Sequence, residues 1–301
     1  VGISYHNRKT LHDRICLAGK AWRPGYHRKS AWASRHRKQL IEAMSHQPWD
    51  ILLSIQGTLD QHTLAQCRRH SPGLKVFYWW GDILTEQAKT RLRAAAEFSE
   101  RILVSAKGDY DQLLPRYPDQ LLYLPFGVAP RFHRVGTISA AEQEKFSAGV
   151  TFVGSCYPER CELIRYLIEH LDTPLKVWGR GWRHCRGVHG NGPLSLADSL
   201  KVHACSKISL NLHHAHTNNG FNMKFYEIPA AGGFQICDWQ PLLAETLLGK
   251  QTVACRSAAE FAERINYYLA HEQQRRQLIR TTSQTVFATE NYASRLAGVF
   301  N

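Results

Sequence analysis

The sequence predicts an α/β fold with two domains, each built around a parallel sheet. Short apolar runs alternate with helical stretches along most of the 301 residues, as expected for parallel strands joined by crossover helices. A segment without a core-strand pattern, residues 126–148, interrupts the alternation, which starts again at Val150. The length also suffices for two domains of ordinary size.

The first half contains four candidate strands, short runs that are rich in apolar, β-branched or aromatic residues. These strands are Ile51–Ile55, Lys75–Trp80, Ile102–Ser105 and Leu121–Pro125. Helical patterns lie between them, for example at Leu59–His70 and Gln87–Phe98. Residues 8–48 are basic with a helical pattern broken at Arg23-Pro24-Gly25, and a first strand is not obvious there. We expect the first domain to span residues 1–133 and a linker to span 134–148.

The second half repeats the alternation. The expected strands are Val150–Val153, Leu175–Trp178, Ile208–His213, Phe234–Cys237 and Thr252–Ala254, and the expected helices are Glu159–His170, Leu196–Cys205 and Ser257–Leu269. Ser195 is a suitable N-cap for the second of these helices, and Ser257 with Glu260 predicts a capping box at the third. We expect this domain to span 149–285, and we expect a long polar helical tail, about 271–300, to close the chain.

Positive charge is concentrated in the first half of the chain. Residues 1–140 contain 21 Lys and Arg against 11 Asp and Glu, a net charge of +10, whereas residues 141–301 contain 17 against 14, a net charge of +3. This bias indicates an anionic partner, such as a phosphorylated glycan, a nucleic acid or a membrane surface. A basic surface without a specific partner is the alternative.

Composition also bears on the compartment. The sequence contains no run of about 18 apolar residues, so it predicts no transmembrane helix. The N-terminus lacks the apolar core of a signal peptide. The cysteines are scattered and form no Cys-x-x-Cys pair. We therefore expect structural thiols in a reducing cytoplasm, rather than disulfides or a cysteine metal site.

Residues 219–238 form the most informative stretch of the sequence. A loop from Asn219 to Asn222 precedes a short helix that carries Lys224 and Glu227, and a Gly-Gly turn then leads into an apolar strand. The first amides of a helix attract anions, and Lys224 adds a full charge. The Glu227 carboxylate can accept two hydrogen bonds from a vicinal diol. The unit predicts a ligand with a phosphate and a hydroxylated sugar.

Two earlier turns have a related pattern. Gly154-Ser155 follows a strand and precedes a helix that carries Arg160, an arrangement that can hold a diphosphate; a purely structural turn is the alternative. The next strand is followed by Gly179-Arg180-Gly181-Trp182, where glycines permit close backbone approach and the indole could flank a base. An ordinary loop with a buried tryptophan is the alternative there.

Histidine and aspartate supply the candidate catalytic groups. His213, His214 and His216 precede the loop at residues 219–222. Strand spacing places His213 on the face opposite to the other two, and no acidic residue is near, so we disfavour a metal site. His216 is the best candidate to line a sugar pocket. Asp82 follows an aromatic strand end and could deprotonate a hydroxyl; an N-cap role is the alternative. Dehydrogenase, Walker and Gly-x-Ser-x-Gly motifs are absent.

The order of these motifs resembles the donor-binding segment of glycosyltransferases with the GT-B fold, two Rossmann-like domains that face each other across a cleft. Asn219 to Asn222 matches the first part of that segment and Glu227 to Gly232 the second. Asn219 stands where those enzymes usually have a glutamate. The combination of Asn, a basic residue and Phe-x-Glu is similar to the spore-maturation-protein-like (CgeB-like) branch, within the group 1 glycosyl transferases.

The resemblance implies a nucleotide-diphosphate sugar as co-substrate, with no other cofactor and no bound metal. It implies that the second domain binds the donor, and that Asp82 and His216 act in catalysis. The implied donor-binding residues are Gly154, Ser155, Arg160, Gly179, Trp182, Asn219, Gly220, Phe221, Asn222, Lys224 and Glu227. It also implies that a C-terminal helix, residues 286–301, crosses back to the first domain.

The expected activity is metal-independent transfer of a sugar to a hydroxyl of an anionic acceptor, with a cell-surface glycan or a lipid-linked glycan favoured. Two alternatives stay open: a nucleic-acid acceptor such as modified phage DNA, and an inactive two-domain protein that binds anionic polymers. The expected location is the cytoplasm, compatible with peripheral association at the inner face of the membrane.

Overall fold

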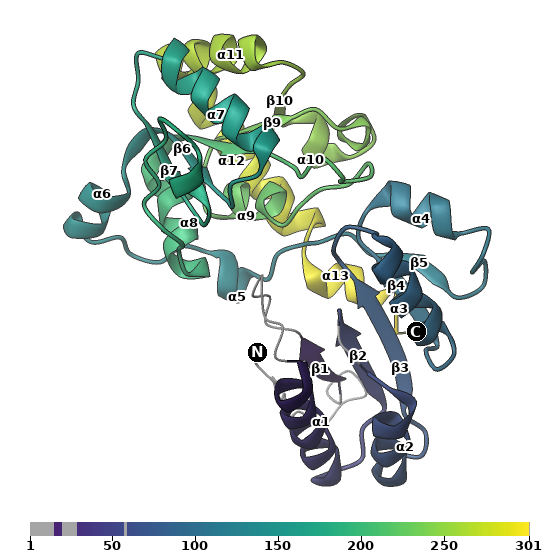
Figure 1. Cartoon of the computed structure of the whole chain (residues 1–301). Helices are drawn as coiled ribbons and strands as arrows, with labels where there is room; N and C mark the ends of the chain where they lie inside the picture. Colours follow the sequence, from purple (N-terminus) through teal and green to yellow (C-terminus); the bar gives the residue numbers. More distant parts are fainter. Residues whose placement is uncertain (1–14, 20–28, 57–58, 301) are drawn as a thin grey trace. The chain divides into compact units, whose positions relative to one another are not determined.

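The computed structural model describes residues 15–19, 29–56 and 59–300, with side chains from Arg37 onward. Contacts divide the chain into two compact units, Val1–Pro125 and Phe126–Asn301 (Figure 1). Among the described residues, each unit contains a five-stranded sheet in which all neighbouring strands pair in parallel. The predicted α/β class is therefore confirmed in both halves of the chain.

The first unit alternates strands and helices without interruption. Its elements are β1 (Ile15–Gly19), α1 (Lys29–Ser45), β2 (Ile51–Ile55), α2 (Gln61–His70), β3 (Lys75–Trp80), α3 (Glu86–Ala96), β4 (Arg101–Val104), α4 (Lys107–Leu113) and β5 (Leu121–Tyr123). The strand order β1-β2-β3-β4-β5 follows the chain. Right-handed crossovers then place the connecting helices on one face of the sheet, where Leu52, Val76 and Ile102 pack against residues of α1 to α4.

The first strand is a correction to the sequence analysis. Residues 15–19 form β1, which pairs with β2 in the register Ile15 to Ile51. The run is only five residues long and lies within a basic segment, so its pattern is weaker than that of the later strands. The expected break at residues 23–25 lies outside the described residues. The other four predicted strands are confirmed to within two residues at each end.

The second unit begins with two short helices and then repeats the alternation. Its elements are α5 (Pro130–His133), α6 (Ala140–Phe146), β6 (Ala148–Val153), α7 (Pro158–His170), β7 (Leu175–Trp178), the 3-10 helix η2 (Trp182–His184), α8 (Leu196–Cys205), β8 (Ser206–Asn211), α9 (Lys224–Ala230), β9 (Gln235–Asp238), the 3-10 helix η3 (Pro241–Ala244), α10 (Leu247–Lys250), β10 (Val253–Cys255), α11 (Ala258–Ala270), α12 (Glu272–Thr289) and α13 (Tyr292–Ala297). The N-caps predicted at Ser195 and Ser257 are confirmed. The Glu260 carboxylate, however, accepts from the Arg256 amide, so the predicted capping box is only partly formed.

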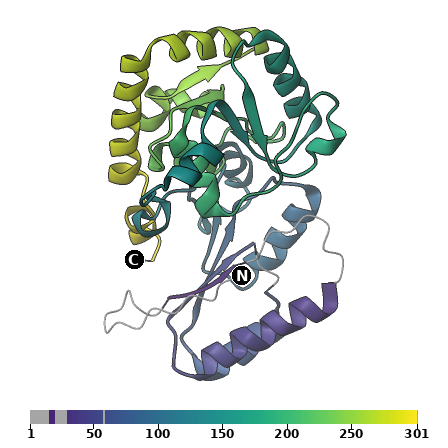
Figure 2. The same cartoon turned by 90° about the vertical axis from the view of Figure 1, so that its left-hand side faces the viewer.

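The sheet of the second unit has the order β10-β9-β8-β6-β7. After β7 the chain returns to the other side of β6, so β6 and β8 are neighbours whose following helices leave toward opposite faces. α7 and α11 pack on one face, through Ile164 and Ile265 among others, and α8 and α9 cover the other face. Figure 2 shows α12 running along one side of this unit. The carboxyl ends of β6 and β8 thus form a topological switch point, where open α/β sheets bind ligands.

The boundary between the units lies earlier than the sequence suggests. Residues 134–148, expected as a linker, contain α6 and the start of β6. Phe146 is buried against Trp178 and Val202, so this segment belongs to the core of the second unit. Polar surface residues on α6 and the short length of this helix hide that role in the sequence.

The C-terminal tail packs against the first residues of the second unit. The Val128 amide donates to the Glu290 carbonyl at 2.9 Å, and the Tyr292 amide donates to the Val128 carbonyl at 2.9 Å. A side chain at Gly127 would meet the Glu290 carbonyl oxygen at 2.6 Å, so this approach requires glycine. The return of residues 286–301 to the first domain stays a prediction.

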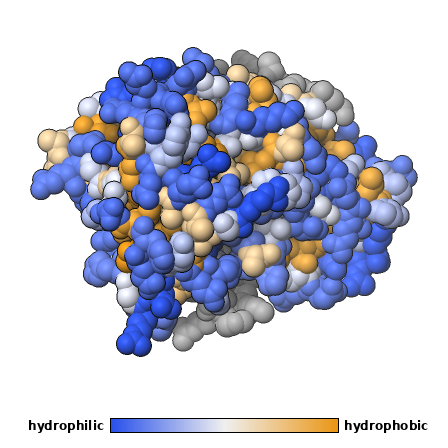
Figure 3. Space-filling model, turned by 90° about the horizontal axis from the view of Figure 1, so that it is seen from above, coloured by the Kyte–Doolittle hydropathy of each residue, from blue (hydrophilic) through white to orange (hydrophobic). Residues whose placement is uncertain are grey.

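The face of the molecule that Figure 3 shows is mainly hydrophilic, with apolar side chains in separate areas between the polar ones. In the described parts of the chain, no helix combines the length and hydropathy needed to cross a membrane.

Candidate functional site

Arg160 joins the two loops at the switch point. It lies in the first turn of α7, and its Nη2 donates to the Leu212 carbonyl after β8 at 2.5 Å. Its Nη1 donates to the Ser155 carbonyl after β6 at 3.2 Å. One guanidinium therefore holds together the loops that follow the two strands, at the place where a ligand of this sheet would bind.

Arg160 forms no direct ion pair with a carboxylate among the residues that the structure describes, although Glu159 and Asp238 interact electrostatically with its charge. Its Nε lacks a hydrogen-bond partner there, and the rings of Phe152 and Tyr157 lie 5.6 and 5.0 Å from the guanidinium carbon. Burial lowers the pKa of Arg160, although nearby groups, Tyr157 and Glu159 first, oppose this shift. A cation that is desolvated in this way favours an anionic ligand, because such a ligand supplies a direct ion-pair partner.

The glycines of the two turns are explained by close backbone packing. Gly179 has a φ of +134°, and a Cβ there would lie 1.9 Å from the Gly154 carbonyl oxygen. The Gly154 amide donates to the Trp178 carbonyl at 2.9 Å, and the Cys156 amide donates to the Arg180 carbonyl at 2.8 Å. The turns after β6 and β7 thus form one rigid surface. Of the residues predicted there, Ser155 and Arg160 keep the polar groups that could reach a ligand.

Trp182 lies in the interior of the second unit. Its side chain is only 1% exposed, its Nε1 donates to the Gly154 carbonyl at 2.8 Å, and its ring meets Phe152 edge-on at 5.7 Å. This placement matches the alternative of a buried tryptophan and supports the turn after β6 from within. A contact between this ring and a base would require the indole to leave the core.

The loop from Asn219 to Asn222 is held by its own side chains. Asn219 has a φ of +45°, and its Oδ1 accepts from the Leu242 amide at 2.8 Å. The Asn222 Oδ1 accepts from the Phe225 amide at 3.1 Å at the start of α9, and its Nδ2 donates to Asn211 Oδ1 at 2.8 Å. These contacts fix the loop between β8 and α9, beside the switch point.

The two middle residues of this loop are buried. Gly220 has little exposed surface, and Phe221 stacks on Phe225 with ring centroids 3.8 Å apart. Phe221 therefore anchors the loop in the core cluster around α9.

Lys224 and Glu227 form an ion pair on α9. Lys224 Nζ lies 2.7 Å from Glu227 Oε2 and 3.3 Å from Ser199 Oγ. The Glu227 side chain is 5% exposed, whereas that of Lys224 is 27% exposed. The lysine thus compensates a buried carboxylate and still reaches the surface, where an anion could share its charge.

His213 and Asp238 form a second polar pair, which the sequence analysis missed. The amide and Nδ1 of His213 contact the same Asp238 oxygen at 2.7 and 2.8 Å, and Gln240 Nε2 donates to the other oxygen at 3.2 Å. Burial raises the pKa of Asp238, but the hydrogen bonds from His213 outweigh it and the net shift is downward. Asp238 is therefore ionised at neutral pH, and its carboxylate accepts the hydrogen bond from His213 Nδ1.

The His213 Nε2 atom is buried and has no hydrogen-bond partner in the described part of the chain. In the neutral tautomer this atom is an acceptor. The signal for this pair was present in the sequence: an acid ends β9 beside a histidine that follows β8. It was missed because it depends on the pairing of the two strands.

His216 lies on the surface near the switch point. Its amide donates to His214 Nδ1 at 3.1 Å, and the His214 ring meets Tyr157 edge-on at 4.6 Å. The Ala215 amide donates to Glu159 Oε1 at 3.3 Å. His214, rather than His216, is therefore the histidine that contacts the β6–α7 turn. A catalytic role of His216 stays a prediction.

Asp82 lies in the first unit, exposed, in a bend after β3. Its Oδ1 accepts from the Ile83 amide at 2.9 Å. The N-cap of α3 is Thr85, whose Oγ1 accepts from the Ala88 amide at 3.2 Å, so the alternative of an N-cap role for Asp82 is wrong. Asp82 and His216 belong to different units, and a joint role in one reaction stays a prediction.

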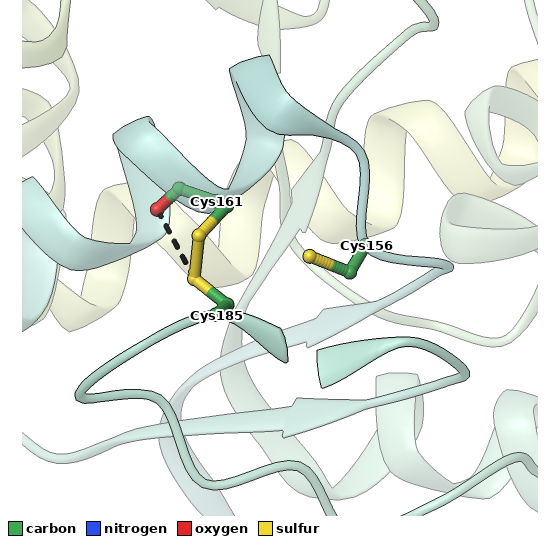
Figure 4. A group of neighbouring side chains, drawn as sticks. All are labelled: Cys156, Cys161 and Cys185. Carbon is green, nitrogen blue, oxygen red and sulfur yellow. Dashed lines mark hydrogen bonds between the residues drawn. A yellow bond between two sulfur atoms is a disulfide. The ribbon is translucent and has the colours of Figure 1, made fainter. Parts of the chain in front are cut away.

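Cysteine pairing is a further correction. Cys161 on α7 and Cys185 after η2 form a disulfide with a Cα–Cα distance of 5.8 Å, whereas the sequence analysis expected structural thiols (Figure 4). The two residues are 24 positions apart, and the contact between the turns after β6 and β7 brings them together. Cys156, a free cysteine, lies beside this disulfide.

Comparison with known proteins supports the same fold. A family model described as "Glycosyl transferase-like" matches residues 160–301. A search of curated proteins found no match.

Three solved structures illustrate the similarity of the whole fold. Sucrose-phosphate synthase from Thermosynechococcus elongatus is 14% identical with a TM-score of 0.59, over 91% of this chain and 78% of that chain. HepE from Anabaena, in complex with UDP-glucose, is 12% identical with a TM-score of 0.61, over 88% of this chain and 80% of that chain. A glycosyltransferase from Rickettsia africae is 10% identical with a TM-score of 0.58, over 93% of this chain and 82% of that chain.

At such identities the similarity concerns the fold alone. The two parallel-sheet units and these neighbours together show that the chain has the GT-B fold of glycosyltransferases, and its second unit from Arg160 onward matches the glycosyl transferase-like family model.

Proposed function

We propose that this protein is a glycosyltransferase that moves a sugar from a nucleotide-diphosphate sugar to a hydroxyl group of an anionic acceptor. The observation that carries the proposal is Arg160, a desolvated cation that forms no direct ion pair with a carboxylate in the described chain and joins the β6 and β8 loops at the switch point. The match of residues 160–301 to the family model and the GT-B fold support the same activity.

The donor diphosphate would bind between the turn after β6 and the start of α9. Arg160 would contact it from α7, Lys224 from α9, and the Ser155 hydroxyl and neighbouring amides from the turn. These groups are fixed before the ligand arrives, so they would stabilise the charge that develops on the leaving diphosphate. Since HepE is seen with UDP-glucose, a uridine diphosphate sugar is the first donor to test.

The ribose, the base, the sugar and the attacking hydroxyl each have a proposed partner in the protein. Glu227 would accept from the ribose diol, once the phosphate shares the charge of Lys224. The turn around Gly179 would lie near the base. His216 would line the sugar pocket, and Asp82 would accept the proton of the attacking hydroxyl. In this mechanism charge is stabilised by protein groups and no bound metal is needed.

The acceptor would bind the basic first unit. A hollow of about 530 Å³ on this unit is lined by side chains of α2 and the end of α3, which are Gln61, Leu64, Ala65, Arg68, Arg69, Glu97 and Phe98. Its two arginines would attract a phosphorylated group. We favour a cell-surface or lipid-linked glycan as the acceptor. We further propose that the protein belongs to the CgeB-like branch, and that it acts in the cytoplasm, at the inner face of the membrane. A nucleic acid such as modified phage DNA is the second candidate.

A panel of nucleotides and nucleotide sugars tests the donor proposal. A ligand at 100 times its Kd stabilises the folded state by about 2.7 kcal/mol, so the melting temperature should rise with a matching nucleoside diphosphate or its sugar. The same donors are then assayed for release of the nucleoside diphosphate with and without acceptor glycans. If no nucleotide at millimolar concentration raises the melting temperature, the donor-site assignment fails. Binding without any sugar release would instead favour the inactive binding protein.

A further inference from the structure

Three cysteine sulfur atoms converge beside the proposed donor turn. Cys156 follows β6, Cys161 lies in the first turns of α7, and Cys185 follows η2, and their Sγ atoms all lie within 4.8 Å of one another (Figure 4). Cys161 and Cys185 are paired as a disulfide, and Cys156 carries a free thiol. A disulfide needs only two sulfur atoms, so the third requires a separate explanation.

The backbone holds the three sulfur atoms in place. The Cys156 amide donates to the Arg180 carbonyl at 2.8 Å, the Cys161 amide donates to the Tyr157 carbonyl at 2.8 Å, and the Cys185 amide donates to the Trp182 carbonyl at 2.9 Å. Cys185 is only 3% exposed, whereas Cys156 and Cys161 are partly exposed. The cluster is therefore fixed by rigid turns and open on one side, as a site that exchanges an ion with solvent must be.

We propose that, when the disulfide is reduced, Cys156, Cys161 and Cys185 bind one thiophilic divalent cation, with Zn²⁺ as the first choice. Zinc binds thiolates at about 2.3 Å in tetrahedral geometry, which places sulfur atoms about 3.8 Å apart. The sulfur atoms already lie within 4.8 Å of one another, so only small side-chain movements are needed. A water molecule would complete the fourth position.

Charge balance supports the site. Three thiolates and one Zn²⁺ carry a net charge of −1, and burial raises the pKa of the Cys156 thiol while the nearby Arg160 charge opposes this shift. The guanidinium would stabilise the anionic complex. The proposed ion is structural and takes no part in sugar transfer, so this inference does not depend on the proposed function.

The chemistry has two steps. A dithiol reductant gives two electrons and two protons to the Cys161–Cys185 bond, which yields two protein thiols, and the reductant becomes a disulfide. The three thiols then bind Zn²⁺ and release three protons, since thiolates are the ligands. Oxidation by a disulfide reverses the first step and expels the ion.

Metal titration of the full chain tests the proposal. The protein is reduced with a dithiol, freed of reductant without oxygen, and titrated with Co²⁺ and then Zn²⁺. We expect one equivalent of Co²⁺ with thiolate charge-transfer absorption, displacement by Zn²⁺, and one bound Zn²⁺ by native mass spectrometry. The Cys156→Ser variant should bind Zn²⁺ at least about tenfold more weakly, because even residues behind the ligands cost about 10–100-fold.

Cys205→Ser is the matched control, since Cys205 is a partly exposed free cysteine outside the cluster. It should bind Zn²⁺ as the unmodified chain does, and the oxidised protein should bind none. Circular dichroism checks that each variant is folded, and Cys161→Ser replaces Cys156→Ser if the latter unfolds. The proposal is overturned if the reduced chain binds no stoichiometric Zn²⁺, or if loss of a cluster cysteine leaves the affinity unchanged.

Discussion

At the scale of single residues, side chains that the sequence predicts to bind the donor also interact with one another. Lys224 and Glu227 illustrate this, because an i,i+3 spacing on a helix brings opposite charges together. The sequence predicts that each of them binds the donor, and the structure shows that they form an ion pair with each other. The spacing itself would have predicted that contact. The ligand is therefore expected to share these charges rather than to find them free.

Glu227→Gln should remove recognition of the ribose diol. If Glu227 accepts from both ribose hydroxyls, the unmodified chain binds UDP about 10–100-fold more tightly than a 2′,3′-dideoxy analogue, since hydrogen bonds to a charged acceptor contribute about 1.5–3 kcal/mol. In the variant the two ligands should bind nearly equally, as calorimetry can measure. Equal discrimination in both proteins would place the diol elsewhere.

Asp238 gives a stability that depends on pH. Its pKa is lowered in the folded protein, so its contribution is present above the unfolded pKa of about 3.9 and is lost as the pH falls through the folded value. Asp238→Asn should lower the free energy of unfolding at pH 7 by about 1–3 kcal/mol. The difference between the two proteins should shrink as the pH falls below 4.

Urea unfolding at a series of pH values measures this difference. Asp198→Asn is a useful control, because Asp198 is a partly exposed carboxylate on α8 that accepts a hydrogen bond from the Ser195 hydroxyl. A constant difference for Asp238→Asn across the acidic range would show that its charge does not stabilise the fold through His213.

At the scale of elements, the turns after β6 and β7 act as one piece. Gly179 is the residue that permits their contact, because a side chain there would overlap the Gly154 carbonyl. Gly179→Ala should therefore destabilise the second unit by about 3 kcal/mol or more, through overlap and an unfavourable φ. Chemical denaturation with a tryptophan fluorescence readout measures the change.

Gly192→Ala is the matched control for Gly179→Ala. Gly192 also has a positive φ, +83°, but a side chain there meets nothing within 4 Å. Its cost should be limited to the backbone term, about 1–2 kcal/mol. Similar costs for the two variants would mean that the turns are not in rigid contact.

The elements show what a sequence can predict and what it cannot. Nine of the strands could be found from short apolar runs, because that signal is local. β1 was missed, since five residues within a basic segment give little pattern. The Cys161–Cys185 pair and the His213–Asp238 pair were missed because both depend on which turns and strands are neighbours. Strand order is a property of the whole sheet, and local patterns do not contain it.

At the scale of the whole molecule, two parallel-sheet units with different charge share one chain. The second unit carries the switch point, the family match and a net charge of +5, whereas the first unit carries a net charge of +8 on fewer residues. This division fits a donor site that uses a few specific charged residues and an acceptor surface whose overall positive charge attracts anions. The predicted two-domain fold is confirmed, although its boundary lies at Pro125 rather than at residue 133.

The central claim is that the switch point of the second unit binds a nucleoside diphosphate through Arg160. Calorimetric titration of UDP into three proteins tests it most directly: the unmodified chain, Arg160→Gln and Arg165→Gln, which removes an exposed arginine from the same helix. We predict a single site, a loss of affinity of about tenfold or more in Arg160→Gln, and unchanged affinity in Arg165→Gln. Binding that is equal in all three folded proteins, or absent from all three for every nucleoside diphosphate, would contradict the claim.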